Sequence, residues 1–154
     1  MDAENSSVVR NNMRKSNVDL EGRVILITGA AGFIGSNLAM DILRNVHPVT
    51  IVGIDNMNDY YDVSIKEWRL QKIKEIAAGN PPSSFEFIKG DISDQKTIEN
   101  LFTKYAPSVV VNLAAQAGVR YSISHPDAYI QSNLIGFYNI LEACRHSYDG
   151  GKTG

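Results

Sequence analysis

The segment from Val24 to Gly35 constrains the fold most strongly, because it joins a short apolar run to three regularly spaced glycines. Residues Val24 to Thr28 have the length and the apolar composition of a buried parallel strand. Gly29, Gly32 and Gly35 then follow at every third position, where the apolar residues take up a helical period. The segment therefore predicts a strand, a tight turn and the beginning of a helix.

A junction of this kind can bind the pyrophosphate of a dinucleotide. The first N–H groups of a helix have no partner within it, and the helix dipole is positive at that end, so an anion is stabilised there. In dinucleotide sites the first glycine makes the turn, the second lets the phosphates approach the backbone, and the third lets the helix pack closely. We expect the cofactor at these residues: Gly29, Ala31, Gly32, Phe33, Ile34 and Gly35.

A second buried strand is predicted from Val49 to Asp55 and ends in an acidic residue. Asp55 follows Gly35 at about the 20-residue separation at which such sites place a ribose-binding carboxylate. The same carboxylate would repel a 2′-phosphate, so the sequence favours NAD over NADP. Asn56 at the same strand end is also a cofactor candidate. The alternative is that Asp55 only caps a helix or shapes a turn.

The rest of the chain alternates between strand and helix patterns. Ser64 and Ser93 are placed to cap the second and third helices, and Pro126 suits the first turn of the last one. The alternation predicts an α/β fold with a doubly wound, Rossmann-like parallel sheet in strand order 3-2-1-4. Strands are expected at 24–28, 49–55, 84–89 and 108–115, and helical stripes at 34–46, 65–77, 98–105 and 130–144.

Further cofactor candidates lie at the ends of the third and fourth strands. Asp91 and Ile92 are expected beside an adenine, because open α/β sheets bind ligands at the carboxyl edge of the strands; a plain turn is the alternative. Tyr60 and Tyr61 could also cover the adenine or form an ordinary packed turn. The fourth strand runs into the small-residue segment 116–118, which leaves room for a flat ring, and contributes three more candidates: Leu113, Ala114 and Ala115.

The last predicted helix carries an apolar stripe that we expect to pack in the core. Asn133 interrupts it and could reach a cofactor phosphate, or could be a solvated helix residue. The single cysteine, Cys144, cannot form an internal disulfide and is expected to be a small buried hydrophobe. The stripe consists of Ile130, Leu134, Phe137, Leu141 and Cys144.

Composition excludes several classes of partner. A net charge of −2 gives no electrostatic reason to expect nucleic acid or an anionic membrane. The apolar runs are far shorter than the ~20 residues of a membrane span, and the first residues do not form a signal peptide, so we expect a cytoplasmic protein. The three histidines lack metal-ligand spacing, so no metal is expected. We expect a flexible arm over residues 1–20 and one nucleotide-binding domain over 21–154.

The glycine spacing G-x-x-G-x-x-G in the segment 28–35 resembles that of the extended short-chain dehydrogenase/reductase superfamily. The resemblance continues in order along the chain, through Asp55, the segment 90–92, the segment 112–115 and the segment 133–136. Two longer stretches, Asp55-Asn-Met-Asn-Asp-Tyr-Tyr-Asp62 and Ala114-Ala-Gln-Ala-Gly-Val-Arg-Tyr-Ser122, resemble the UDP-glucuronate 4-epimerases.

The resemblance implies hydride chemistry on NAD with a UDP-sugar substrate. In that family a tyrosine phenolate takes the proton of the sugar 4-hydroxyl, NAD takes the C4 hydride, and the 4-keto sugar rotates before the hydride returns. The catalytic tyrosine and lysine follow a fifth strand, and the sugar nucleotide binds in a C-terminal domain. This sequence ends before either, so we expect no catalytic residue in it, no activity from it alone, and a homodimer for the intact enzyme.

Three expectations depend on this resemblance. Arg120 is expected to face the sugar site, with a solvated loop arginine as the alternative. Tyr148 and Lys152 have catalytic spacing, but two glycines between them disfavour a rigid helix, so we do not expect them to act in catalysis. The fourth strand, 109–113, would lack its fifth-strand neighbour, which predicts dimerisation or aggregation through an exposed edge.

The resemblance leaves two alternative functions open. The first is another extended-family enzyme, either a UDP-glucose 4-epimerase or a nucleotide-sugar 4,6-dehydratase. The second is a non-catalytic module that senses NAD with the same fold.

Overall fold

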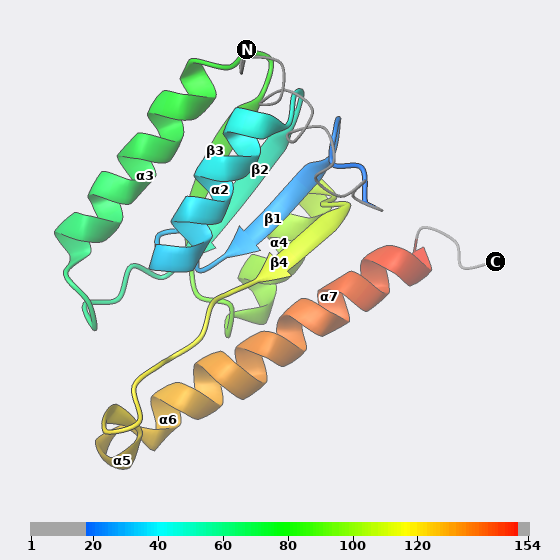
Figure 1. Cartoon of the computed structure of the whole chain (residues 1–154). Coiled ribbons are helices and arrows are strands. Elements are labelled where there is room, and N and C mark those ends of the chain that lie inside the picture. The colour runs from blue at the N-terminus through cyan, green and yellow to red at the C-terminus, as the bar shows by residue number, and fades with distance from the viewer. Residues whose placement is uncertain (1–17, 151–154) are drawn as a thin grey trace, which may run out of the picture.

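The structure is a computed structural model that describes residues 18–150 (Figure 1). The flexible arm expected at 1–20 and Lys152 therefore lie wholly or largely outside the described residues. The elements are β1 (Val24–Thr28), α2 (Phe33–Asn45), β2 (Thr50–Asp55), α3 (Val63–Ala78), β3 (Ser84–Lys89), α4 (Gln95–Tyr105), β4 (Val109–Asn112), α5 (Tyr121–Ser124), α6 (Pro126–Tyr129), the π-helix η1 (Ile130–Gly136) and α7 (Phe137–Gly150).

The four strands form one parallel sheet in the order β3-β2-β1-β4, which confirms the predicted topology. In the centre of the sheet, Leu26 of β1 pairs with Val52 of β2 and with Val110 of β4. Because all strands run the same way, their carboxyl ends meet at one edge, which is where ligands bind in open sheets of this kind.

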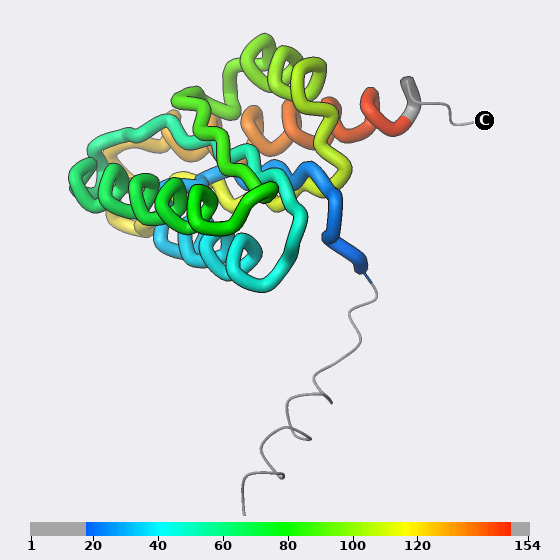
Figure 2. The backbone as a smooth tube through the Cα atoms, turned by 90° about the horizontal axis from the view of Figure 1, so that it is seen from above, coloured from blue at the N-terminus to red at the C-terminus, as the bar shows by residue number. Residues whose placement is uncertain are grey.

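Helices cover both faces of the sheet (Figures 1 and 2). On one face, Ile25 and Ile27 of β1 pack in a core with residues of α2 and α3. On the other face, Leu26 of β1 packs with residues of α4 and α7. Side chains alternate along a strand, so β1, which is buried on both sides, has an apolar residue at nearly every position.

Aspartates, not the predicted serines, cap α3 and α4. Asp62 Oδ1 accepts from the Ser64 N–H at 2.8 Å, and Asp94 Oδ1 accepts from the Lys96 N–H at 3.1 Å. A carboxylate in this position also complements the helix dipole, which a hydroxyl does not. Ser93 instead donates its hydroxyl to Asp91 Oδ1 at 2.7 Å.

The fourth strand is shorter than predicted and ends at Asn112. The N–H groups of Leu113 and Ala114 both donate to Thr28 Oγ1, each at 3.0 Å, and so leave the strand ladder. The Thr28 hydroxyl donates to Asn112 Oδ1 at 2.5 Å. One buried threonine at the end of β1 thus ends β4 and turns the chain outward.

The stripe predicted to pack in the core along the last helix is largely exposed. Ile130, Leu134, Phe137 and Leu141 are between 45% and 58% exposed, whereas Ile140 and Ala143 on another face are buried. Two features decide this orientation. The π-helix changes the helical period over seven residues, and the Asn139 amide donates to the carbonyls of Ile92 at 2.9 Å and Ser93 at 3.0 Å.

Three smaller expectations concern Cys144, Tyr148 and the edge of β4. Cys144 is half-buried and packs beside the α4 and α7 core, and this burial raises the pKa of its thiol, as for a small hydrophobic residue. Tyr148 is exposed. β4 lies at an edge of the sheet, as expected, whereas association through that edge stays a prediction.

Candidate functional site

A hollow that opens to solvent lies at the carboxyl edge of the sheet, which is where open α/β sheets bind ligands. The loops that follow all four strands contribute to it. Nine of the predicted cofactor residues line it: Gly29, Gly32, Asp55, Asn56, Asp91, Ile92, Leu113, Ala114 and Ala115. The other lining residues are Ile54, Asn58, Tyr60, Tyr61, Lys66, Gly90, Gln116, Ala117 and Ser132.

The glycine turn has the geometry that the sequence predicts. Gly29 has a φ of 65°, a conformation that L side chains rarely adopt. A Cβ on Gly35 would lie 2.3 Å from the Gly29 carbonyl oxygen, so the helix approaches the turn as closely as a glycine permits. Ala31, Phe33 and Ile34 of the same segment do not line the hollow, and Phe33 and Ile34 are exposed.

The start of α2 differs from the starts of α3 and α4. Its N-cap is Gly32, and no side chain caps its first turn, whereas aspartates cap the other two helices. As in α3 and α4, no acidic residue lies in the first turn itself. The free N–H groups and the dipole of α2 are thus open to an external anion beside the hollow.

Asp55 has the turn-shaping role that the sequence left open, and its contact with a ribose stays a prediction. Its Oδ1 accepts from the Met57 N–H at 2.9 Å, which shapes the turn after β2. Its Oδ2 accepts from the Ala31 N–H at 3.1 Å, which ties it to the glycine turn. The residue is 8% exposed and lines the hollow. A carboxylate has room for about four hydrogen bonds, so lone pairs remain for a ligand hydroxyl.

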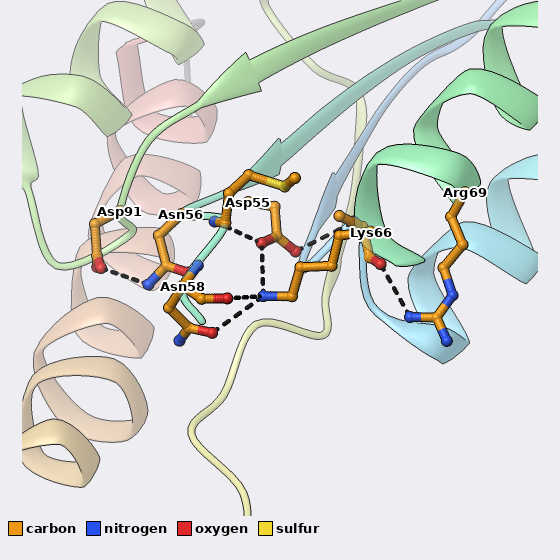
Figure 3. A network of polar contacts seen from close by, with 8 residues as sticks. Asp55, Asn56, Asn58, Lys66, Arg69 and Asp91 are labelled. Atoms are coloured by element: carbon orange, nitrogen blue, oxygen red, sulfur yellow. Dashed lines mark hydrogen bonds and ion pairs between the residues drawn. The ribbon is translucent and has the colours of Figure 1, made fainter. Parts of the chain in front are cut away.

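A chain of polar contacts crosses the hollow from Asp91 to Asp55 (Figure 3). Asn56 donates its Nδ2 to Asp91 Oδ2 at 2.8 Å, and its Oδ1 accepts from the Asn58 N–H at 3.1 Å. Lys66 Nζ donates to the Asn58 carbonyl at 2.9 Å and to Asn58 Oδ1 at 3.0 Å, and lies 3.6 Å from Asp55 Oδ1. The floor of the hollow is therefore held rigidly by donors and acceptors.

Asp91 is charged in this environment. Burial acts to raise the pKa of its carboxyl group, but hydrogen bonds from Asn56 and from the backbone and side chain of Ser93 together outweigh burial and lower it. The hollow thus presents two carboxylates to a ligand. Such groups accept hydrogen bonds from hydroxyl or amino groups.

The sequence did not reveal Lys66 as a site residue. The predicted helical stripe included Ile65 and Trp68, which are exposed, while the buried face of α3 consists of Lys66, Leu70, Ile73 and Ala77. A charged residue in phase with three apolar ones at helical spacing is the signal that could have identified it. Lysine is seldom buried without a partner, so such a residue indicates a specific contact.

Two other contributors to the site also escaped prediction. Thr28 holds the peptides of Leu113 and Ala114, as described above. Arg69 of α3 donates its Nη1 to the Ala31 carbonyl at 3.3 Å, and its guanidinium lies 5.8 Å from the centroid of the Phe33 ring. Both side chains form hydrogen bonds with backbone groups of the loops, and the order of residue types in a sequence does not predict such contacts.

Asn133 binds the loop that follows β4. Its Oδ1 accepts from the Gln116 N–H at 2.8 Å, and its Nδ2 donates to the Gln116 carbonyl at 3.0 Å. One helical turn earlier, the Tyr129 hydroxyl donates to the carbonyls of Ala117, at 2.9 Å, and Gly118. Both ends of the amide are engaged, so Asn133 is not simply solvated; its contact with a cofactor phosphate stays a prediction.

An aromatic cluster joins the loop after β2 to the segment after β4. The Tyr60 ring lies 4.7 Å from that of Tyr61 and 4.9 Å from that of Tyr121, between ring centroids. The His125 ring stacks on Tyr121 at 4.2 Å. Because Tyr60 and Tyr61 also line the hollow, they form part of its wall as well as a packed turn. Stacking on an adenine stays a prediction.

Arg120 is exposed at the N-cap position of α5 and does not line the hollow. Its expected contact with a sugar stays a prediction. Between residues 18 and 150, no three His, Cys, Asp or Glu side chains are grouped so as to hold a metal ion. In the same part of the chain no helix has both the length and the apolar character needed to cross a membrane.

Comparisons with known proteins agree with this arrangement. A protein-family model described as GDP-mannose 4,6 dehydratase matches residues 26–153. Protein CapI of Staphylococcus aureus is 50% identical over 122 residues, which are 79% of this chain and 34% of that protein. UDP-glucuronate 4-epimerase 4 of Arabidopsis thaliana is 40% identical over 124 residues, which are 80% of this chain and 26% of that protein.

A solved structure gives the same result for the fold. The UDP-glucose 4-epimerase of Thermus thermophilus, in complex with NAD, matches with a TM-score of 0.60 at 31% identity. The match covers 80% of this chain and 34% of that one, so the chain spans about a third of the length of such proteins. With the family model matched over most of its length, the chain belongs to the nucleotide-sugar epimerase and dehydratase family of the extended short-chain dehydrogenases/reductases.

Proposed function

We propose that this chain is the NAD-binding part of a nucleotide-sugar epimerase, and specifically of a UDP-glucuronate 4-epimerase. One observation carries the proposal: the buried Asp55 carboxylate and the uncapped start of α2 border the same hollow, joined by the Ala31 N–H bond. A dinucleotide needs both, because its ribose hydroxyls are hydrogen-bond donors and its pyrophosphate is an anion.

In this proposal, each part of the cofactor contacts a different group of the lining residues. The pyrophosphate lies at the turn from Gly29 to Gly35, and the adenosine ribose lies at Asp55. The adenine lies between Asp91 and Ile92 on one side and the loop of Tyr60 and Tyr61 on the other. The small residues Ala114 and Ala115 leave space along the sheet edge for the rest of the dinucleotide.

NAD bound here would supply a hydride acceptor for C4 of the sugar. The residues of this chain would bind and orient it, and Arg120 on the loop after β4 would face the sugar nucleotide. Tyr148 and Lys152 are the one tyrosine and lysine pair at catalytic spacing in the sequence, and the two glycines between them disfavour a rigid helix, so a proton donor and acceptor for the 4-hydroxyl would come from elsewhere. We therefore propose that the chain binds NAD but does not epimerise a sugar by itself, and that the intact enzyme is a homodimer.

The sugar assignment is supported by the stretches 55–62 and 114–122 and by the relatives that bear this name. A UDP-glucose 4-epimerase is the second candidate, favoured by the similarity to the Thermus thermophilus enzyme. The two candidates share the cofactor site and differ in the sugar that they accept. A non-catalytic NAD-binding module would share the same site and turn over neither sugar.

Isothermal titration calorimetry of the 154-residue chain with NAD tests the cofactor proposal. We expect saturable binding that Asp55→Ala weakens, because the ribose hydroxyls then lose their acceptor; heats no larger than those of dilution for the wild type would refute it. Incubation with NAD and either UDP-glucuronate or UDP-glucose tests the second part. We expect no epimer of either sugar, so turnover of one would contradict the proposed inactivity and identify the substrate.

A further inference from the structure

Asp55 and Lys66 form an ion pair at the floor of the hollow. Their charged atoms are 3.6 Å apart, and each side chain is 8% exposed. Both residues line the hollow, and Lys66 is the one cationic side chain among the lining residues that the structure describes. Figure 3 shows its ammonium group between Asp55 and Asn58.

Each member of the pair is held independently of the other. Two hydrogen bonds from Lys66 Nζ to Asn58 keep the ammonium group in place. The N–H groups of Ala31 and Met57 hold the Asp55 carboxylate. Neutralising Asp55 would therefore leave the cation at its present position, with one partner fewer and at the edge of the space where a ligand binds.

The pair lies beside the position that decides between NAD and NADP. The following step depends on the proposed function, in which Asp55 accepts from the adenosine ribose. The 2′ position of that ribose is then next to the carboxylate and close to Lys66. A 2′-phosphate meets the Asp55 charge first, whereas without that charge it would meet a buried, uncompensated cation, which binds phosphate well.

We infer that the Asp55–Lys66 pair, and not Asp55 alone, sets the cofactor preference, and that Lys66 is the cation of a latent 2′-phosphate site that Asp55 masks. In the wild type the two charges compensate each other, so the hollow accepts the uncharged ribose of NAD. Loss of the carboxylate charge converts the same hollow into a site for the dinucleotide that carries the extra phosphate.

Five proteins separate the two residues: the wild type, Asp55→Asn, and Asp55→Asn combined with Lys66→Met, with Lys66→Arg or with Lys72→Met. The Kd for NAD and for NADP is measured for each by titration calorimetry, with circular dichroism to show that each is folded. Lys72 lies on the same helix but pairs with Glu75 at the surface, so its replacement removes an equal charge outside the hollow. If Asp55→Asn does not fold, Asp55→Ser removes the same charge with a smaller side chain.

We expect Asp55→Asn to raise the affinity for NADP relative to NAD by about tenfold or more, which corresponds to at least one charged hydrogen bond. When combined with Asp55→Asn, Lys66→Met should abolish the gain in NADP affinity. Lys72→Met and Lys66→Arg, which leave a positive charge at position 66, should both keep it. Equal NADP affinities for Asp55→Asn with and without Lys66 would overturn the inference while leaving the proposed function intact. Absence of NAD binding by the folded wild type would overturn both.

Discussion

The side-chain amide of Asn133 binds the peptide groups of Gln116 on both sides: the Gln116 N–H donates to Oδ1 at 2.8 Å, and Nδ2 donates to the Gln116 carbonyl at 3.0 Å. This pair of bonds joins the π-helix to the loop after β4, whose residues 113–117 line the hollow. The long C-terminal helix thus supports the wall of the site without itself forming most of it.

Asn133→Ala removes both bonds. We expect the free energy of unfolding to fall by about 1–2 kcal/mol, because each neutral hydrogen bond contributes roughly 1 kcal/mol and Gln116 is buried. The affinity for NAD should fall as well, since the loop loses its anchor. Urea denaturation and calorimetry measure the two effects. Asn100→Ala, at an exposed position of α4, is the control, and equal effects of the two substitutions would contradict this role for Asn133.

Lys66→Met leaves the Asp55 carboxylate buried without its cation. Removing one member of a buried ion pair costs about 3–5 kcal/mol, whereas a surface pair contributes about 0–1 kcal/mol. We therefore expect a loss of about 3 kcal/mol for Lys66→Met and of less than about 1 kcal/mol for Lys72→Met, both measured by urea denaturation. Losses that agree within about 0.5 kcal/mol would mean that the Lys66–Asp55 contact does not stabilise the fold.

Gly35→Ala places a Cβ 2.3 Å from the backbone oxygen of Gly29, which cannot move without opening the turn. We expect a loss of about 3 kcal/mol or failure to fold, at the upper end of overpacking effects. Gly79→Ala is the matched control, because its Cβ would meet only ordinary contacts at 3.5–3.6 Å and its φ is −78°. That variant should keep or slightly raise the melting temperature, so a similar decrease in both would refute the predicted close approach.

The pH dependence of stability should contain a contribution from Asp91. Its pKa is lowered in the folded protein by Asn56 and Ser93, so its contribution is present above the unfolded pKa of about 3.9 and is lost as pH falls through the folded value. Asp91→Asn should therefore be less stable than the wild type at about pH 7, and the difference should shrink below about pH 4. Asp127→Asn, at an exposed position, serves as the control; a pH-independent difference for Asp91→Asn would contradict the assignment.

The exposed apolar residues of η1 and α7 predict self-association, together with the free edge of β4. Phe137→Glu with Leu141→Lys should lower the average mass in light scattering at high concentration, because charges would then be buried in any contact on this helix face. Ile123→Glu, an equally drastic change at an exposed residue of α5, should have no effect. Persistent association of the double variant would assign the contact to the β4 edge.

Local patterns predicted the fold well where neighbouring residues decide the structure. The strand 84–89 was predicted to the residue, the glycine turn has its positive φ at Gly29, and the sheet order follows from helices long enough to connect parallel strands. Nine of the predicted cofactor residues line one hollow, because the carboxyl ends of parallel strands meet at one edge. The prediction for the last helix was wrong, because apolar residues at helical spacing can face either the core or solvent, and the stripe from Ile130 to Leu141 is largely exposed.

What the residues alone could establish is therefore the order of the elements, the anion-binding turn and the family. Contacts between distant parts of the chain decided the rest. Thr28 ends β4, a strand that begins 81 positions later at Val109. Asn139 selects the face of α7 that meets the sheet, and Lys66 is directed into the hollow beside Asp55. The physical reason is that a helical period specifies which residues share a face, whereas burial and hydrogen bonds from other elements specify what that face touches.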